Sequence, residues 1–303
     1  MQMRRILLNI VLALVLLSGS LSYANEAVVG VTKDLRIVAS FYPVYIMAKN
    51  VTKGVPGVSL QNLTPPLTGC LHDYSVTTND MKKLSDAQVF VASGAGMESF
   101  LDKIIAQHPN LKIIQLSGGI SLIKSKGDEG DNPHVWVSIS NVMIQVKNLG
   151  KAMAEIDPVH KELYANNTAA YLVKLENLSQ KMHSELGCYR RRAIITFHEA
   201  FSYFAREFDF NIVAVIEREP GSEPSARELA DTVELVKKNG IHELFSEPQY
   251  SAVAADTIAK ETGAKIYVLD PAVTGPDDYD AYINIMENNL SVLKKAFGNN
   301  QKG

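Results

Sequence analysis

Short apolar runs alternate with longer amphipathic stretches along most of this chain. An apolar run bounded by turn residues indicates a buried strand, and apolar residues at every third or fourth position indicate a helix with one buried side. On this basis we predict strands at residues 35–41, 58–63, 88–92, 111–116, 193–197, 212–216, 243–246 and 265–269. Helices are predicted at 42–51, 97–107, 140–155, 200–208, 225–238, 252–262 and 278–297, with a short one beginning at Thr78. This alternation predicts an α/β fold with mainly parallel sheets.

The stretch that follows Asp157-Pro158 keeps a helical period for unusually long. About 28 residues at ~1.5 Å each give a helix of roughly 40 Å, which is longer than one lobe requires. At 303 residues the chain also exceeds the size of a single ordinary core. We therefore predict two lobes, each a mainly parallel sheet flanked by helices, joined by one long rigid helix. The predicted divisions are residues 25–156, 157–187 and 188–303.

Residues 1–24 show the three regions of a secretory signal peptide. Arg4 and Arg5 precede an apolar run over residues 6–17, and small residues lead to an expected cleavage after Ala24. The run is short for a membrane span, and no cysteine lies near the cleavage point, so we expect a soluble periplasmic protein without a membrane anchor. Without the two arginines of the signal, the net charge of −3 becomes −3 − 2 = −5, which argues against nucleic acid as a partner.

Three histidines and one aspartate stand at the ends of predicted strands or in the loops that follow them. They are His72, His134, His198 and Asp270, and His134 lies between a proline and the only tryptophan of the sequence. Ligands of open parallel sheets bind beyond the carboxyl ends of the strands, so we expect two ligands from each lobe to meet at one metal ion. Any one of the four taken alone is more often structural, since an Asp-Pro pair can simply begin a turn. The other histidines are interpreted as structural because they fall in or beside helices: His108, His160, His183 and His242.

Several neighbouring residues have weaker claims on this site. Glu199 competes as a ligand, although a carboxylate in the first turn of a helix is also favoured by the helix dipole. Glu247 and Arg218 follow predicted strands and should lie near the ligands between the two lobes. We expect them to be loop residues, or at most to contact a ligand without binding the metal. Cys70 and Cys188 are predicted to be free thiols, because chain direction places them far apart if the histidines near them meet at one ion. Cys70 as an extra ligand is the weaker alternative.

Eight short segments together resemble one known family, the metal-binding receptors of bacterial ABC importers for zinc and manganese (cluster A-I), and most closely the high-affinity zinc-uptake receptors. The resemblance covers about residues 35–297 and is carried by Phe41-Tyr42-Pro43, Pro65-Pro66, His72-Asp73-Tyr74, Lys83-Leu84-Ser85-Asp86-Ala87, Pro133-His134-Val135-Trp136, Thr196-Phe197-His198-Glu199-Ala200-Phe201, Glu223-Pro224-Ser225 and Val268-Leu269-Asp270-Pro271. It implies that His72, His134 and His198 bind the metal with Asp270 nearby. It also implies a rigid interlobe helix and a monomer that delivers its ion to an ABC permease in the inner membrane.

The chain departs from the family pattern in two places. The loop over residues 117–131 has no histidine, whereas zinc receptors often carry a His-rich loop there. Thr68-Gly69-Cys70-Leu71 also replaces the usual Gly-Ala-Asp-Pro before the first histidine. Both departures alter the surroundings of the predicted site without removing any of its four ligands.

The ligand types bear on which ion is carried and on what the site does. Imidazole suits zinc and carboxylates suit manganese, and the family's manganese members have a Glu where His198 stands, so we expect Zn²⁺ as the transported ion. A manganese or iron receptor of the same family is the alternative. A zinc-dependent hydrolase is the rival from another class, but it needs an open coordination position and a general base, for which Glu199 is the only candidate. A surface adhesin of the family is disfavoured by the missing lipid-attachment cysteine.

Overall fold

Two four-stranded parallel sheets form the framework, one in each lobe. The computed structural model describes residues 34–65, 71, 74–125, 130–216, 224–248 and 252–298. The first sheet consists of β1 (Leu35–Ala39), β2 (Val58–Asn62), β3 (Val89–Ala92) and β4 (Lys112–Gln115), in the order β2-β1-β3-β4. Every neighbouring pair is parallel. The inner strand β3 is buried over its whole length and β1 over its last three residues, as expected of strands covered on both faces.

The second sheet repeats this plan. It consists of β5 (Ala193–Thr196), β6 (Asn211–Val215), β7 (Glu243–Ser246) and β8 (Lys265–Val268), in the order β6-β5-β7-β8, again with all pairs parallel. In both sheets the direction of winding reverses between the first and third strand of the lobe. The switch point of each sheet, where ligands of open parallel sheets usually bind, therefore lies beyond the carboxyl ends of β1 and β3 in one lobe and of β5 and β7 in the other.

Helices connect the strands in chain order. In the first lobe they are α2 (Tyr42–Val51), α3 (Thr78–Asp86), α4 (Asp102–Ile105) and α5 (Ile139–Ile156). In the second they are α7 (Ser202–Phe208), α8 (Ala226–Lys238), α9 (Ala252–Thr262) and α10 (Ala281–Gly298). Their starts follow local sequence: Pro43 occupies the first turn of α2, and α3 and α8 begin with capping boxes made by Thr77 with Asp80 and by Ser225 with Glu228.

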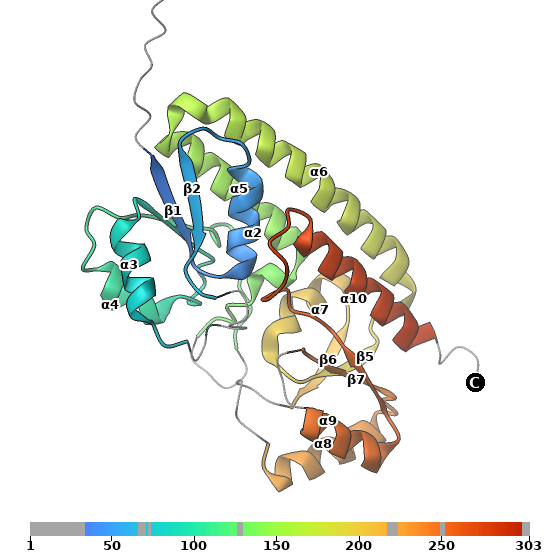
Figure 1. The fold of residues 1–303 in the computed structure, drawn as a ribbon. Helices are drawn as coiled ribbons and strands as arrows, with labels where there is room; N and C mark the ends of the chain where they lie inside the picture. The colour runs from blue at the N-terminus through green and yellow to red at the C-terminus, as the bar shows by residue number, and fades with distance from the viewer. Residues whose placement is uncertain are drawn as a thin grey trace, which may run out of the picture. The chain divides into compact units, whose positions relative to one another are not determined.

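The long helix α6 (Lys161–Leu186) spans 26 residues and belongs to neither sheet. It packs on α2 and α5 of the first lobe and on α10 of the second, and Figure 1 shows it running past all three. Tyr164 and Tyr171 are buried near its start, and Leu175, Met182 and Leu186 are buried farther along. The predicted long interlobe helix is therefore present.

The principal hydrophobic core is shared by both lobes. It joins Val44 and Trp136 of the first lobe to Leu175 of α6 and to Phe204 and Phe297 of the second. Smaller clusters lie beneath α8 and α9 and around α3 and α4. Because one core serves both sheets, the lobes are not independently packed bodies, and the divisions at residues 156 and 187 remain predictions.

The structure differs from prediction where polar side chains reorganise a helix start. The helix expected at 97–107 is a 3-10 turn (Ser99–Leu101) followed by the single turn α4. Glu98 explains this, because its buried carboxylate accepts hydrogen bonds from the Ser93 and Gly94 amides, at 2.7 and 3.0 Å, and from the Ser40 hydroxyl at 2.8 Å. Similarly, α10 begins at Ala281 rather than at 278, since the Asp278 carboxylate accepts a hydrogen bond from the amide of Asp280 and forms a turn.

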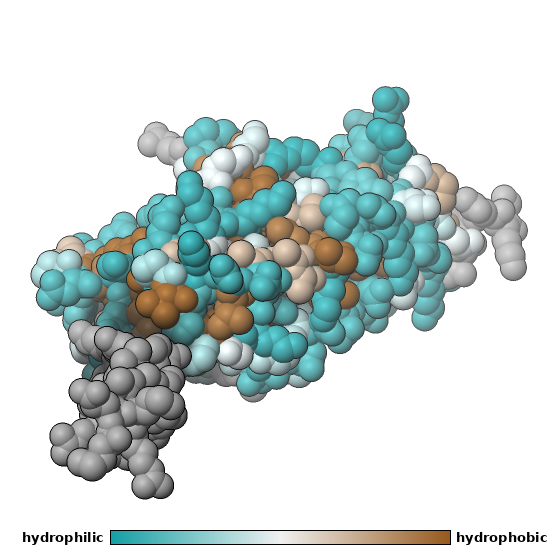
Figure 2. All heavy atoms as spheres, turned by 90° about the horizontal axis from the view of Figure 1, so that it is seen from above, coloured by the Kyte–Doolittle hydropathy of each residue, from teal (hydrophilic) through white to brown (hydrophobic). Residues whose placement is uncertain are grey.

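The face of the molecule drawn in Figure 2 is mostly hydrophilic. On the face drawn in Figure 2, apolar residues gather in small separate patches between hydrophilic ones. The most exposed large apolar side chains, Val159, Val173 and Val253, are far apart in the sequence. None of the helices in the described part of the chain is both long and apolar enough to cross a membrane.

Candidate metal site

His198 and Glu247 lie at the switch point of the second sheet. His198 follows β5 and Glu247 follows β7, the two strands between which the winding reverses. Both side chains are almost fully buried, and Nδ1 of His198 lies 3.5 Å from Oε2 of Glu247. The Thr196 hydroxyl donates to the carbonyl oxygen of His198 at 3.0 Å and fixes the turn by which the chain leaves the strand. Parallel winding thus brings together two residues that are 49 positions apart.

His134 approaches from the first lobe. It is 2% exposed and precedes a 3-10 turn, Val135–Val137, that leads into α5. The rings of His134 and His198 meet edge to face, with 4.6 Å between their centroids and an interplanar angle of 88°. Two imidazoles from opposite lobes are therefore in direct contact inside the protein.

Asp270 lies two residues beyond the end of β8 and is partly exposed. Its backbone is held by Asn289 of α10, whose side chain accepts from the Asp270 amide at 2.9 Å and donates to its carbonyl oxygen at 2.8 Å. One carboxylate oxygen accepts from the Ala272 amide at 2.8 Å. The next carbonyl, that of Pro271, accepts from the Trp136 indole N–H at 2.8 Å, which ties the Asp270 loop to the turn after His134.

The fourth predicted ligand, His72, lies outside the described residues, as do Arg218 and Cys70. On its two sides the chain is anchored in the first lobe: Leu71 is fully buried, and the Tyr74 hydroxyl donates to Asp80 at 2.6 Å. Within the described part of the chain, no three His, Cys, Asp or Glu side chains lie close enough together to hold a metal ion. The four-ligand set therefore stays a prediction.

Burial disfavours the charged forms of two carboxyl groups, that of Glu247 beside His198 and that of Asp270. Burial raises the pKa of Glu247, an effect that the adjacent His198 opposes. Burial also raises the pKa of Asp270; the hydrogen bond from Ala272 lowers it, and the charge of Glu247 raises it further. A cation bound between these groups would relieve both effects, since an opposite charge favours the ionised carboxylate.

Other predicted residues lie in ordinary structural settings. His160 contacts the Asp157 carboxylate at 2.7 Å, and His183 contacts the Ser179 carbonyl at 2.9 Å within α6. Cys188 is exposed and free.

The sequence interpretation missed Asn132, whose side-chain oxygen contacts both the backbone amide and the ring of His134. The only signal in the sequence was a polar residue two positions before the histidine.

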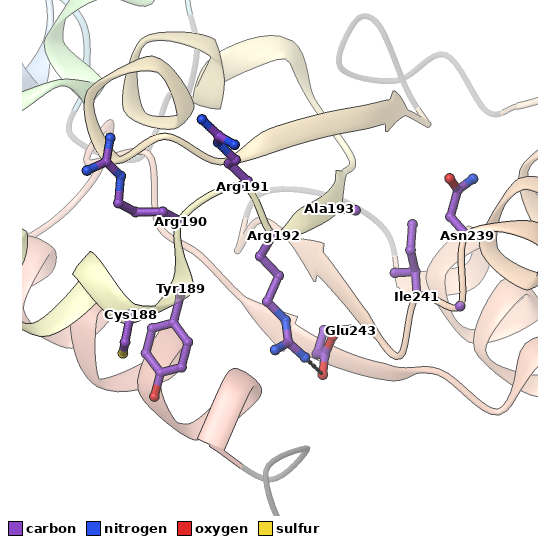
Figure 3. A pocket seen from close by; sticks show the side chains of 10 residues that line it. Cys188, Tyr189, Arg190, Arg191, Arg192, Ala193, Asn239, Ile241 and Glu243 are labelled. Atoms are coloured by element: carbon purple, nitrogen blue, oxygen red, sulfur yellow. Dashed lines mark hydrogen bonds and ion pairs between the residues drawn. The ribbon is translucent and has the colours of Figure 1, made fainter.

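A separate pocket of about 360 Å³ lies at the opposite edge of the second sheet, beside the starts of β5 and β7. Figure 3 shows Arg190 and Arg191 extending away from Arg192, which turns toward Glu243. Arg192 lies 3.4 Å from Glu243 and stacks over the Phe297 ring. Its charge is thus partnered by protein groups, and the pocket is distinct from the histidine pair at the carboxyl edge.

Comparison with known proteins identifies relatives along almost the whole described chain. A sequence model of the family "ZnuA: Zinc-uptake complex component A periplasmic" matches residues 37–296. The chain is 32% identical over 284 residues to the zinc-binding lipoprotein AdcA of Streptococcus pneumoniae strain R6. This alignment covers 86% of this chain and 56% of AdcA. It is 30% identical over 282 residues to the high-affinity zinc uptake system protein ZnuA of Bacillus subtilis. This alignment covers 86% of this chain and 87% of ZnuA. The chain thus spans little more than half the length of AdcA.

Solved structures show the same architecture. The Mn²⁺ complex of the binding protein FpvC from Pseudomonas aeruginosa superposes with a TM-score of 0.79 at 27% identity, covering 88% of this chain and all of FpvC. Zn(II)-bound AdcA from Streptococcus pneumoniae gives 0.76 at 31% identity, covering 87% of this chain and 57% of AdcA. The predicted two-lobed α/β fold is confirmed by these likenesses and by the two sheets described above.

Proposed function

The chain belongs to the ZnuA family of periplasmic zinc-uptake components, and on that premise we propose that it captures Zn²⁺ in the periplasm and delivers it to an ABC permease. The observation that carries the proposal is the buried contact between His134 and His198, one from each lobe. Two adjacent imidazoles that are 2% and 1% exposed have little structural use, whereas paired imidazole nitrogens are suitable ligands for zinc.

We assign His72, His134, His198 and Asp270 as the ligands. Support for Asp270 comes from its tethered loop, which Trp136 connects to the turn beside His134. Three imidazoles and one carboxylate make a set that suits zinc better than manganese, which prefers oxygen ligands. Glu247 would remain outside the ligand set and face Nδ1 of His198.

The shared core indicates how loading would proceed. Because α6 and the principal core span both lobes, a large hinge closure would break packed apolar contacts. We therefore propose that the ion is enclosed mainly by ordering of the ligand side chains and their loops. The protein would act as a monomeric receptor, and the transported ion would be its cargo rather than a cofactor.

The relatives and neighbours define the alternatives to be tested. FpvC is described in complex with Mn²⁺ and AdcA as bound to Zn(II), so competition between these ions is the relevant measurement. A hydrolase would need a base beside the ion. The only candidate for that base is Glu199, at the start of a 3-10 turn, where its backbone carbonyl accepts a hydrogen bond from the Asn132 side chain. The family assignment supports a transport receptor instead of an enzyme.

Isothermal titration of the chelator-stripped chain with Zn²⁺ and Mn²⁺ tests the proposal. We expect one zinc per chain, bound far more tightly than manganese. His183→Ala serves as a matched control, since His183 bonds within α6 away from the proposed site. Equal weak binding of both ions, or loss of binding in the control alone, would contradict the proposal. Anomalous scattering at the zinc edge would then identify the ligands.

A further inference from the structure

The side-chain amide of Asn132 has only one orientation that satisfies its neighbours. Nδ2 donates to the carbonyl oxygen of Glu199 at 2.9 Å, and Oδ1 accepts from the backbone amide of His134 at 3.0 Å. Turning the amide over would place N–H against N–H and oxygen against oxygen. Because Asn132 is 0% exposed, no solvent can compensate such a mismatch, so the position of Oδ1 is fixed.

That fixed oxygen determines which ring nitrogen of His134 carries the proton. Oδ1 of Asn132 also lies 3.0 Å from Nδ1 of His134. An amide oxygen can only accept, so Nδ1 must donate, and in the neutral ring the lone pair then resides on Nε2. The histidine is held in one tautomer before any ligand arrives, and the tautomer follows from the amide orientation.

The same residue also connects the two halves of the histidine pair. Glu199, whose carbonyl accepts from Asn132, immediately follows His198 in the chain. The backbone carbonyl of Asn132 accepts from the Tyr203 hydroxyl at 2.7 Å, and its backbone amide donates to Ile123 at 2.7 Å. Every polar group of Asn132 is therefore bonded, with partners in both lobes.

We propose that Asn132 is the positioning residue of this site: it orients His134 through Nδ1, presents Nε2 as the metal-binding nitrogen, and locks the His134 turn to the segment that follows His198. The inference rests on the proposed function only where metal affinity is concerned. The tautomer of His134 is a property of the metal-free chain and can be measured without any ion.

Long-range ¹H–¹⁵N NMR of the histidine rings in the metal-free chain at pH 8 tests the first part, with the His134 signals assigned from the spectrum of His134→Ala. We expect Nδ1 to be protonated and Nε2 to be bare. Protonation at Nε2 in the wild-type chain overturns the proposal, whether or not any variant folds.

Variants test the second part by zinc titration with a competing chelator. Asn132→Leu should lose the single tautomer and bind Zn²⁺ about 10–100-fold more weakly, as for other groups that orient a ligating histidine. Asn132→Asp keeps the acceptor toward Nδ1 of His134 and should retain the tautomer, although its second oxygen then faces the Glu199 carbonyl oxygen and should lower the stability of the fold. The control Asn167→Leu removes an amide that donates to the Val51 and Lys53 carbonyls, and it should change neither readout.

The outcomes separate the two proposals. If the wild-type chain has the expected tautomer but does not bind zinc, the proposed function is wrong, while the proposal that Asn132 orients His134 is retained. Tight zinc binding that is unaltered in Asn132→Leu, with the tautomer also unaltered, overturns the orienting role alone. Equal losses in Asn132→Leu and Asn167→Leu would show that Asn132 acts only through the stability of the fold, which also overturns it.

Discussion

Replacing Trp136 with phenylalanine should destabilise the protein by about 3 kcal/mol, as much as truncating a large core side chain, although an aromatic ring is kept. Trp136 is 0% exposed, packs edge-on against Phe41 with 4.8 Å between ring centroids, and donates its indole N–H to the Pro271 carbonyl. Trp136 belongs to the first lobe and Pro271 to the second. The substitution therefore weakens an apolar contact within the first lobe and removes a hydrogen bond between the lobes.

The expected loss has two parts. Leaving the buried Pro271 carbonyl without its donor costs about 1–3 kcal/mol. The lost ring atoms and the cavity they leave add roughly 1–2 kcal/mol, less than the 3–5 kcal/mol of a full truncation to alanine. A total near ~3 kcal/mol corresponds to a fall in Tm of roughly 6–12 °C, using ~2–4 °C per kcal/mol for a chain of this size.

Far-UV circular dichroism should follow the unfolding, because the variant lacks the only tryptophan of the chain. Tyr282→Phe is the matched control: the Tyr282 hydroxyl donates to the Trp136 carbonyl at 2.9 Å, and its removal leaves the packing volume nearly unchanged. We expect about 1 kcal/mol from the control. If the unfolding free energy of Trp136→Phe lies within ~0.5 kcal/mol of the wild-type value, the indole does not stabilise the contact between the lobes.

The remaining predictions concern the site and its supports. His134→Ala should lower zinc affinity by orders of magnitude in calorimetric titration while the circular dichroism spectrum is preserved; unchanged affinity would remove His134 from the site. Glu247→Gln should raise the Tm of the metal-free chain at pH 8, because burial disfavours its charge and raises its pKa, and should weaken zinc binding; a lower Tm would contradict this. Burial alone would raise the pKa of Asp80, but hydrogen bonds from Tyr74 and Thr77 hold it below the usual value. The stability that Asp80 adds over Asp80→Asn should thus be complete above pH ~4 and disappear as the pH falls through the lowered pKa, which urea unfolding across that range measures. Zinc at 100 times its Kd should raise the unfolding free energy by about 2.7 kcal/mol, and a chelator should abolish the gain.

The strands were readable from the sequence because buried parallel strands leave a strong local signal, whereas their order within each sheet was not predicted. Apolar runs such as residues 193–197 and 243–246 coincide with β5 and β7, and the position of His198 beyond the first of them follows directly. The contact between His134 and His198 was expected on topological grounds, and the structure brings these two together. Whether His72 and Asp270 complete a ligand set with them is still a prediction.

What the sequence could not provide were partners that depend on three-dimensional packing. An apolar pattern shows that Trp136 is buried, but it does not show that Pro271 of the other lobe accepts its hydrogen bond. Asn132 has no periodic signature at all, because a single amide in a loop acquires its role only from the groups around it. The short α4 was missed for the same reason, since Glu98 bonds backward to groups at the ends of β1 and β3.

α10 packs on α2 although the two helices are far apart in the sequence, so the core of the first lobe depends on a segment that is synthesised much later. Tyr282 and Phe297 of this helix belong to the same core as Val44 in the first lobe, and α10 lies against both α6 and α2. The first sheet therefore lacks part of its apolar cover until α10 has folded, and a chain without α10 would expose that apolar surface. A variant that ends at residue 280 and so lacks α10 should aggregate or be degraded instead of accumulating as a folded first lobe. Sedimentation and protease digestion would show this.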